Sequence, residues 1–421
     1  MVQRVWGQLK AVGLAESAVI ATSKSQVNIL QSQLGEFVEL VVEPERRDTY
    51  PAIALAAAYL SSVQRVGLNE VVAVVPVDAY VDNCFFELVK ELEEVVRSTE
   101  AELALVAVTP QYSSERHGYI VLQPEQAGQE LVKVCCFKEK PTKEQAEELI
   151  AQHALWNCGV FAFKLSYLLA KLEEQGLPTD YRELIEDYAA LPKTSFDYEV
   201  VEKAGNILAL RYEGAWKDLG TWDTLTEEIS TPIIGNGLLS EDCQGTHLIN
   251  ELDIPLIVLG LSNIVVAASP DGILVADKKA SSRVKDLLKG AVPRPMFEER
   301  RWGWYRVLDH VNYENGCEVL TKRIRILAGK NLSYQVHYQR SEVWSIINGE
   351  GEFAVDDVVY GVKPGDVLHI PVGVKHGIWA RTDLEFIEVQ TGSQLIEEDI
   401  TRIFLTWPEV TQHCQRPDFS N

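Results

Sequence analysis

The sequence predicts an α/β fold in its first half and an all-β fold in its second half. Three observations indicate this division. Two continuous apolar runs, "VVAVVPV" (71–77) and "LALVAV" (103–108), flank a segment with helical periodicity. From about residue 234 the apolar pieces become short and closely spaced. A chain of 421 residues is also too long for one ordinary hydrophobic core, so two or three domains are expected.

The first half reads as strands joined by helical crossovers. Between the two apolar runs, Phe85, Val89, Leu92 and Val96 recur at helical spacing, which predicts strand, helix, strand. A further helix is predicted from Thr142, where T-x-x-Q fits a capping box. This pattern predicts a three-layer α/β domain over residues 1–233, with its strands buried on both faces of a parallel sheet.

The second half is predicted to contain two β regions. In residues 234–295, short pieces begin at Leu256, Ile264 and Ile273, which fits either a few rungs of a β-helix or a β-meander. In residues 296–410, strands alternate with turns such as "KPGD" and "PVG". That spacing predicts a small β-barrel or sandwich.

Composition and charge restrict the class of partner. The chain has 39 basic and 62 acidic residues, so its formal charge is 39 − 62 = −23. Such a surface repels phosphate backbones, so we expect no nucleic acid and no membrane as the main partner. The N-terminus lacks a signal-peptide core, no apolar run is long enough to span a membrane, and the seven cysteines include no C-x-x-C pair. We therefore expect a soluble, cytoplasmic protein with reduced thiols.

The predicted β domain carries a pattern typical of metal ligation. Gln335, His337 and Glu342 lie in a G-x5-Q-x-H-x4-E segment, and His376 ends the G-x5-P-x-G-x2-H segment. Residues 335 and 337 share one face of a strand, and the other two can approach from neighbouring strands. Two imidazoles, a carboxylate and an amide oxygen suit Zn, Mn, Fe or Ni better than Ca. The alternative is that the histidines only fill a barrel interior.

The α/β half has acidic residues where strands end. Asp78 follows the first apolar run, and Asp218 lies in "AWKDLGTW". If the fold brings them together, the two carboxylates can hold the Mg²⁺ on which phosphoryl or nucleotidyl transfer depends. The alternatives are that Asp78 caps the following helix and that Asp218 caps a turn.

Other segments of this half offer groups that suit a nucleotide or a sugar. Arg47, Asp48 and Thr49 lie in a turn before a predicted helix, where basic and hydroxyl groups suit a phosphate or a purine edge. The same turn could equally be a capped, solvated one. The segments "HGYI" (117–120), "FKEKP" (137–141) and "LWNCGVFAF" (155–163) combine polar groups with glycines, as sugar hydroxyls require.

Taken together and in this order, these segments resemble the mannose-1-phosphate guanylyltransferase family, over essentially the whole chain. The strongest points are "RRDTYPAIALA", "VVPVDAYVD", "FKEKP", "LWNCGVF", "FDYEVVEK" and "WKDLGTW". The resemblance implies a Rossmann-like nucleotidyltransferase domain, a short β-helix-like connector and a C-terminal cupin barrel. The set Gln335, His337, Glu342 and His376 is similar to the metal ligands of phosphomannose isomerases, which are also cupins.

The resemblance also implies a reaction and a set of roles. GTP and mannose 1-phosphate would give GDP-mannose and pyrophosphate, with Asp78 and Asp218 holding Mg²⁺. The residues expected near guanine are Arg47, Asp48 and Thr49, and those expected around mannose are Gly118, Tyr119, Glu139, Lys140, Asn157 and Gly159. By analogy with other cupins we expect a homodimer, and Zn²⁺ or another divalent metal in the barrel.

Two departures from the family shape the functional expectation. The family begins with a glycine-rich loop that cradles the triphosphate, and no such loop is found in this sequence. We therefore expect weak transferase activity for these 421 residues, and a start codon further upstream. After His337 the sequence reads Tyr338 and Gln339 where relatives have a histidine run, which disfavours isomerase activity in the cupin. The alternatives are a truncated or regulatory sugar-phosphate binder with a metal-bearing cupin, and a phosphomannose isomerase.

Overall fold

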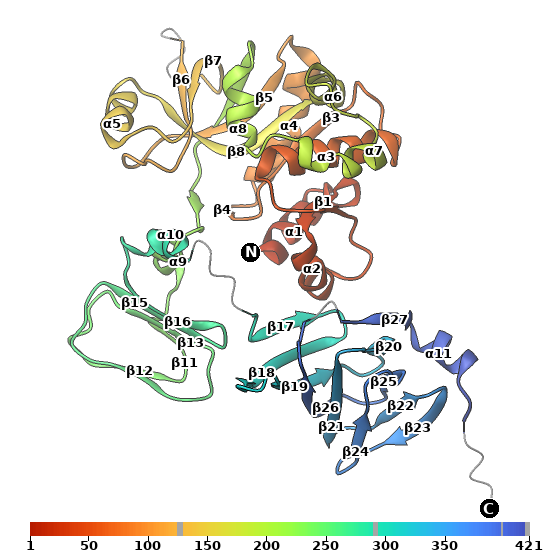
Figure 1. Cartoon of the computed structure of the whole chain (residues 1–421). Helices are drawn as coiled ribbons and strands as arrows, with labels where there is room; N and C mark the ends of the chain where they lie inside the picture. Colours follow the sequence, from red (N-terminus) through yellow and green to blue (C-terminus); the bar gives the residue numbers. More distant parts are fainter. Residues whose placement is uncertain (124–128, 289–293, 397–398, 417–421) are drawn as a thin grey trace, which may run out of the picture. The chain divides into compact units, whose positions relative to one another are not determined.

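The structure is a computed structural model that describes residues 1–123, 129–288, 294–396 and 399–416 (Figure 1). The chain forms two compact units, Met1–Leu225 and Thr226–Asn421. A further boundary near residue 295 stays a prediction. Among the described helices, none is both long and apolar enough for a membrane crossing.

A six-stranded mixed sheet forms the centre of the first unit, in the order β3-β8-β5-β9-β7-β6. Its strands are β3 (Val71–Val74), β5 (Leu103–Val108), β6 (Tyr119–Leu122), β7 (Leu131–Lys138), β8 (Leu155–Lys164) and β9 (Ile207–Tyr212). Strands β5 and β9 are parallel, whereas β8 is antiparallel to both β3 and β5. The prediction of a parallel sheet was therefore only partly right, because β8 lies between the two predicted strands.

Helices cover both faces of this sheet. The helices found up to this point in the chain are α1 (Val2–Ala11), α2 (Val27–Leu34), α3 (Thr49–Ser62), α4 (Phe85–Ser98), α5 (Lys143–Ala151), α6 (Leu165–Glu174), α7 (Tyr181–Glu186), α8 (Phe196–Glu199) and α9 (Trp222–Glu228), the last of which crosses the boundary between the units. Leu103 and Leu105 of β5 pack in one core with α3, α6 and α7, while Ala104 and Val106 pack in another with α4. Because side chains alternate along a strand, this division places β5 in the middle of three layers, as predicted.

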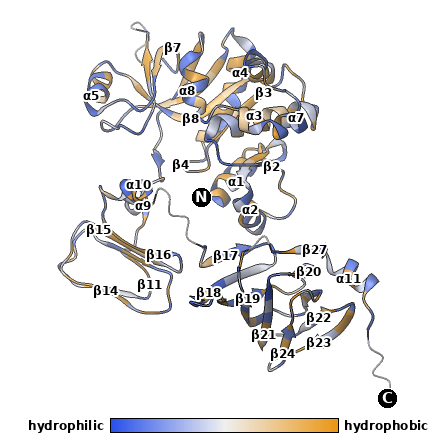
Figure 2. Cartoon of the chain, viewed as in Figure 1, coloured by the Kyte–Doolittle hydropathy of each residue, from blue (hydrophilic) through white to orange (hydrophobic). Residues whose placement is uncertain are grey.

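The predicted helices are confirmed. The apolar positions of α4 are buried, including Phe85 and Leu92. Helix α5 begins after Thr142, whose side chain accepts from Gln145 N while the Gln145 side chain returns to the Thr142 backbone, as a capping box requires. Figure 2 shows hydrophobic residues concentrated on the strands of the central sheet, which the helices cover.

Strand β3 is less buried than its apolar sequence predicts. Ala73 is exposed, and the side chain of Val77 just beyond the strand is 46% exposed. Within the described ranges, β3 pairs only with β8, so it forms the edge of its sheet. A mainly apolar cavity of about 560 Å³ is lined by β3 and by β1 (Ile20–Ser23), which pairs with β2 (Leu40–Glu43) in a separate sheet. The expectation of burial on both faces was therefore wrong for residues 71–77.

The second unit begins with short strands arranged as in a β-helix. They are β11 (Ile233–Gly235), β12 (Gly237–Leu239), β13 (His247–Asn250), β14 (Leu256–Val258), β15 (Ile264–Ser269) and β16 (Gly272–Asp277), followed by α10 (Val284–Leu287). Strands β11, β13 and β15 are parallel neighbours, and β12 is parallel to β14. Because a meander has antiparallel neighbours, this pairing favours the β-helix alternative. Strand β16 departs from it, since it forms a hairpin with β15.

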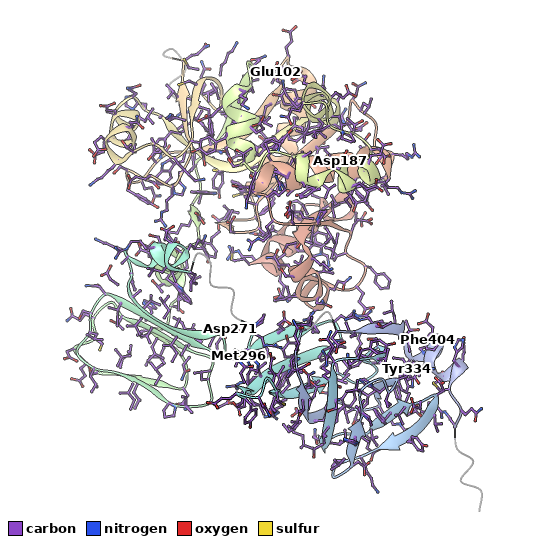
Figure 3. The ribbon with its side chains drawn as sticks, viewed as in Figure 1. Glu102, Asp187, Asp271, Met296, Tyr334 and Phe404 are labelled. Atoms are coloured by element: carbon purple, nitrogen blue, oxygen red, sulfur yellow. The ribbon has the colours of Figure 1, made fainter. Side chains whose placement is uncertain are left out.

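The rest of the second unit is a cupin-like barrel of two sheets. One sheet has the order β17-β18-β19-β26-β21-β24 and the other β23-β22-β25-β20-β27. The strands are β17 (Phe297–Arg300), β18 (Gly303–Asn312), β19 (Glu318–Ile326), β20 (Tyr334–Val336), β21 (Arg340–Asn348), β22 (Gly351–Val355), β23 (Val358–Val362), β24 (Val367–Ile370), β25 (His376–Ala380), β26 (Leu384–Gly392) and β27 (Thr401–Phe404), and α11 (Trp407–His413) follows. Strand β27 pairs with β20, where the rings of Phe404 and Tyr334 stack with centroids 6.0 Å apart (Figure 3).

Candidate functional site

Asp78 and Asp218 are brought close together by two short strands. Strand β4 (Ala79–Val81) begins directly after Asp78, and β10 (Trp216–Asp218) ends at Asp218. The two strands pair antiparallel with Asp218 opposite Ala79, and Leu219 N donates to the carbonyl of Asp78 at 3.4 Å. Asp78 is exposed and Asp218 is half-buried. The fold thus brings the backbones of two aspartates that are far apart in the sequence onto adjacent strands at the surface.

The local structure bears on the two alternative roles of these aspartates. Helix α4 has Cys84 as its N-cap, so Asp78 is not the residue that caps it. Asp218 does support a turn, because its Oδ1 accepts from Gly220 N at 2.7 Å. A Cβ at position 220 would lie 2.8 Å from that oxygen, so a larger residue there would push the Asp218 carboxylate aside. The turn holds the Asp218 carboxylate in a defined orientation.

Gly118, Glu139 and Asn157 lie together where β6, β7 and β8 meet, and these residues form the polar group of the first unit. Asn157 N donates to the carbonyl of Gly118 at 2.9 Å, and Glu139 follows the end of β7. A Cβ at Gly118 would lie 2.6 Å from Glu139 Oε2, so these two residues touch. Asn157 Oδ1 accepts from the amide of Gly159, whose φ of 72° suits glycine. Four residues predicted to surround a sugar therefore lie together.

The two remaining residues predicted for the sugar differ in exposure. Lys140 is at the surface, with its Nζ 3.0 Å from Glu139 Oε1. Tyr119 is fully buried, and its hydroxyl accepts from Ser114 N at 2.9 Å. The side chain of Tyr119 therefore packs in the core beside the group, and its contact with a ligand stays a prediction.

The environment of Glu139 favours its protonated form. Burial raises the pKa of Glu139 to about 7, and the nearby negative charge of Asp197 adds to the effect. Asp197 itself accepts from Asn157 Nδ2 at 2.9 Å, and burial raises its pKa as well. Near neutral pH this polar group can therefore donate as well as accept hydrogen bonds, which suits sugar hydroxyls.

The turn that contains Arg47, Asp48 and Thr49 lies beside Asp197. Thr49 Oγ1 accepts from Phe196 N at 2.9 Å, and the charge of Asp48 contributes to the raised pKa of Asp197. Asp48 caps α3 through Thr49 N, and Arg47 donates to the carbonyl of Leu191. These contacts confirm the capped turn and show that it adjoins the polar group.

His117 connects the two regions and was not among the predicted site residues. Its ring centroid lies 4.6 Å from that of Trp156 and 5.3 Å from that of Trp216. Burial lowers the pKa of His117 to about 4, although the negative charge of Asp218 nearby acts to raise it. A neutral, aromatic histidine therefore lies between the Asp218 strand and the polar group at Gly118.

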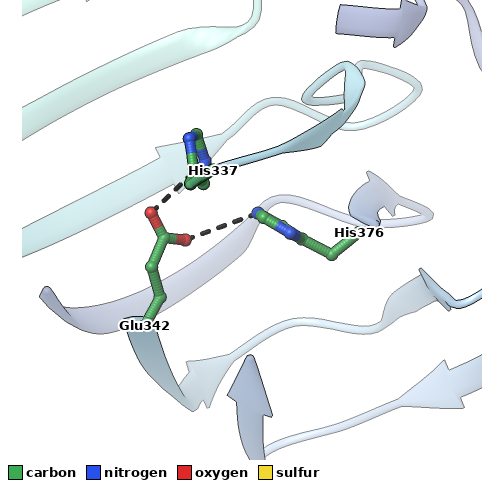
Figure 4. Close-up of side chains that lie close together, drawn as sticks. All are labelled: His337, Glu342 and His376. Carbon is green, nitrogen blue, oxygen red and sulfur yellow. Dashed lines mark ion pairs between the residues drawn. The ribbon is translucent and has the colours of Figure 1, made fainter. Parts of the chain in front are cut away.

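The cupin barrel contains a separate cluster of possible metal ligands. His337, Glu342 and His376 are buried, and their ligand atoms lie within 4.8 Å of one another (Figure 4). Nε2 of His337 and Nε2 of His376 are each 3.5 Å from a different oxygen of Glu342. Glu342 lies on β21, His376 begins β25, and His337 directly follows β20. Gln335 of β20 pairs with His376, and Glu342 pairs with Ile370 of β24. Strand pairing therefore gathers the predicted set.

Backbone carbonyls orient both imidazoles of this cluster. Nδ1 of His337 donates to the carbonyl of Asp399, and Nδ1 of His376 lies 3.0 Å from the carbonyl of Val374. Because a carbonyl can only accept, each Nδ1 carries the proton and each Nε2 presents its lone pair to the centre. Metal-ligating histidines are oriented in this way in other proteins.

The charge and the open positions of the cluster fit a cation. Burial alone would raise the pKa of Glu342, but its neighbours His376, His337 and Arg340 hold that pKa below its usual range. Nε2 of His376 is buried without a hydrogen-bond partner among the residues that the structure describes. An ionised carboxylate beside an unmatched imidazole lone pair suits a divalent transition metal.

Gln335 faces the cluster with its amide nitrogen. Nε2 of Gln335 lies 3.1 Å from Nε2 of His337, while its Oε1 accepts from Ser333 Oγ at 2.7 Å. Ligation through the amide oxygen therefore requires the opposite orientation of this amide. The role of Gln335 as a fourth ligand stays a prediction.

Three functional candidates were missed by sequence reasoning. Asp197 lies in "FDYEVVEK", which was noted only as a point of family resemblance. His117 lies in "HGYI", where the glycine and tyrosine were chosen instead. Arg340 lies between two predicted ligands and carries no motif signal that distinguishes it from a surface arginine. In each case the missing information was a tertiary contact.

Known protein families match both halves of the chain. Residues 1–231 match the family model described as nucleotidyl transferase, and residues 295–404 match the one described as mannose-6-phosphate isomerase C-terminal. Among curated proteins, the mannose-1-phosphate guanylyltransferase of Sinorhizobium fredii is 28% identical, over 86% of this chain and 76% of that protein. The mannose-1-phosphate guanylyltransferase ManC of Salmonella typhimurium is 26% identical, over 96% of this chain and 90% of that protein.

A solved structure supports the similarity in fold. It is described as mannose-1-phosphate geranyltransferase from Thermus thermophilus and superimposes with a TM-score of 0.54 at 25% sequence identity. The alignment covers 68% of this chain and 87% of that structure.

Proposed function

The chain belongs to the nucleotidyl transferase family, and we propose that it transfers a guanylyl group from GTP to mannose 1-phosphate, giving GDP-mannose and pyrophosphate. The relatives' names point to these substrates. The observation that carries the proposal is the pairing of β10 with β4, which sets Asp218 beside Asp78. Two aspartates on adjacent strands at the surface could supply the carboxylates that a Mg²⁺-dependent transfer between phosphates requires.

The aspartates act on the phosphates in this proposal. An oxygen of the sugar phosphate attacks the α-phosphorus of GTP, and the bond to the departing pyrophosphate breaks. Asp78 and Asp218 would hold Mg²⁺, which supplies positive charge to the phosphate oxygens when bound. The turn at Gly220 keeps the Asp218 carboxylate oriented before the substrates arrive. Such preorganisation lowers the cost of stabilising charge in the transition state.

The polar group at β6, β7 and β8 is proposed to bind the sugar. Glu139 and Asn157 offer donors and acceptors, and the absence of a side chain at Gly118 makes room for Glu139 beside it. With its pKa near 7, Glu139 is largely protonated in mildly acidic solution and repels a sugar phosphate less than an ionised carboxylate does. Lys140 supplies an opposing positive charge. We assign the turn at Arg47, Asp48 and Thr49, next to Asp197, to the guanine.

Pyrophosphate release tests this proposal. The assay contains GTP, mannose 1-phosphate and Mg²⁺, with ATP and glucose 1-phosphate as alternative substrates. Asp78→Asn and Asp218→Asn should each lower turnover at least about a hundredfold without a change in unfolding temperature. Asp253→Asn removes the same charge from a side chain that is 93% exposed in the other unit, and it should not alter turnover. Near-normal turnover of Asp218→Asn would refute the assigned role.

A second comparison in the same assay tests how active residues 1–421 are. Weak turnover by residues 1–421 stays a prediction from the missing glycine-rich loop. The same assay should therefore be run on a chain that includes any in-frame residues encoded upstream. No turnover by either chain would favour the sugar-phosphate binder over the enzyme.

We also propose that the cupin binds a divalent transition metal through His337, Glu342 and His376. The arrangement of two oriented imidazoles around a buried carboxylate supports it. Metal analysis of protein purified without a histidine tag should find about one metal ion per chain. His376→Ala should lose it, whereas His369→Ala, at an exposed position of β24, should keep it. Isomerase activity is tested separately, by conversion of mannose 6-phosphate to fructose 6-phosphate.

A further inference from the structure

A buried arginine lies inside the proposed metal cluster of the cupin. Arg340, at the start of β21, is 7% exposed. Its Nε donates to Glu342 Oε1 at 2.9 Å, and its Nη2 donates to His337 Nε2 at 3.3 Å. Its Nη1 donates to the carbonyl of Ile396 at 3.0 Å. A guanidinium is costly to bury, and these three contacts offset the cost.

Arg340 uses the same acceptor atoms that a metal would use. His337 has one lone pair on Nε2, since its Nδ1 proton is donated to the carbonyl of Asp399. That lone pair now faces two donors, Gln335 Nε2 at 3.1 Å and Arg340 Nη2 at 3.3 Å, and coordination through Nε2 requires both to move away. Glu342 Oε1 is likewise the oxygen that faces both Arg340 and His337. The guanidinium and a metal therefore compete for two of the three ligands.

The third ligand is left unmatched by this arrangement. Nε2 of His376 lies 3.5 Å from Glu342 Oε2 and is without a hydrogen-bond partner in the described part of the chain. Trp344 and Gln390 also donate to Glu342, and Gln335 also faces His337. Arg340 thus supplies the positive charge beside Glu342 and His337 but makes no contact with His376 Nε2. A metal would satisfy all three, at the cost of placing its double charge next to the guanidinium.

We infer that Arg340 is a built-in counter-cation, which balances Glu342 when the metal is absent and weakens metal binding when it is present. This inference rests on the proposed metal site. Like charges a few ångströms apart in a buried site repel strongly even at an effective dielectric constant of about 20. Metal binding must therefore displace the guanidinium from His337 or tolerate the repulsion. Arg340 is a positioning residue for Glu342 and sets the affinity of the site.

Zn²⁺ and Mn²⁺ titrations of the full-length, metal-free protein test the inference. Arg340→Gln keeps hydrogen-bond donors but removes the charge, and we expect it to bind Zn²⁺ at least about tenfold more tightly than the unmodified chain. Arg381→Gln is the matched control, because that side chain is 58% exposed, and it should not alter the affinity. An equal or weaker affinity of Arg340→Gln would overturn the inference.

A measurement without metal tests the pairing of Arg340 with Glu342, whereas the Zn²⁺ affinity distinguishes the inference from a merely structural role. Arg340→Gln should lower the unfolding temperature of the metal-free protein, because Glu342 then loses its counter-charge. Adding Glu342→Gln to that variant should recover part of the loss, and strictly additive effects would refute the pairing. If neither the unmodified chain nor Arg340→Gln binds Zn²⁺, the proposed metal site itself is wrong and the inference falls with it. If both bind equally, only the inference fails.

Discussion

Replacing Glu139 by glutamine should stabilise the first unit above neutral pH. Burial and Asp197 raise the pKa of Glu139 from 4.5 to about 7, so its proton is held more tightly in the folded state than in the unfolded one. A group of this kind adds stability at low pH that is lost as the pH rises through the folded pKa. The shift of 7 − 4.5 = 2.5 corresponds to about 3 kcal/mol, lost mainly between pH 4.5 and 7. Glutamine does not titrate, so Glu139→Gln should not suffer this loss.

Hydrogen exchange of the first unit provides the assay. Peptides from β5 and β8 report the opening of this unit separately from the cupin. At pH 8, Glu139→Gln should raise the free energy of opening by about 2 to 3 kcal/mol more than it does at pH 5. Comparing variant and unmodified chain at the same pH cancels the intrinsic pH dependence of exchange. Glu147→Gln, at an exposed position of α5, is the control and should have no effect at either pH. The same effect of Glu139→Gln at pH 5 and pH 8 would refute the reasoning.

Two further predictions concern packing. Gly118→Ala should destabilise the first unit by about 1 to 3 kcal/mol in chemical denaturation, because the added Cβ would lie 2.6 Å from both Glu139 Oε2 and Phe137 Cζ. An unchanged midpoint would mean that the side chains of Glu139 and Phe137 can move aside at no cost. Leu105→Ala, in the fully buried strand β5, should cost about 2 to 5 kcal/mol, whereas Val74→Ala in the half-exposed strand β3 should cost less than about 1.5 kcal/mol. Equal costs, measured by the same hydrogen exchange, would contradict the edge position of β3.

The two aspartates lie near the polar group in the first unit. Asp218 ends β10, and Trp216 of the same strand contacts His117. His117 precedes Gly118, whose carbonyl accepts from Asn157 N. The metal-binding and sugar-binding roles proposed for these residues would therefore operate in neighbouring parts of the first unit. Their assignment to catalysis rests on the variants described above.

Much of the fold could be predicted from local patterns. The apolar run of β5, the periodicity of α4 and the capping box at Thr142 all appear in the structure as predicted. These features depend on residues close in sequence, whose spacing expresses the geometry of a strand or helix directly. The apolar run 71–77 was misjudged because edge and central strands can share the same composition, and only the neighbouring strands distinguish them.

The sequence alone determined the types of element, the metal-ligand spacing in the barrel and the family resemblance of both halves. Tertiary structure decided which distant groups meet. The register of β10 against β4 puts Asp218 beside Asp78. The hydrogen bond from Asn157 Nδ2 to Asp197 adds a carboxylate to the residues proposed to bind the sugar. The fold also directs Arg340 inward, onto the atoms expected to hold a metal. The physical reason is that side-chain contacts between remote segments depend on strand pairing and burial, which local spacing does not encode.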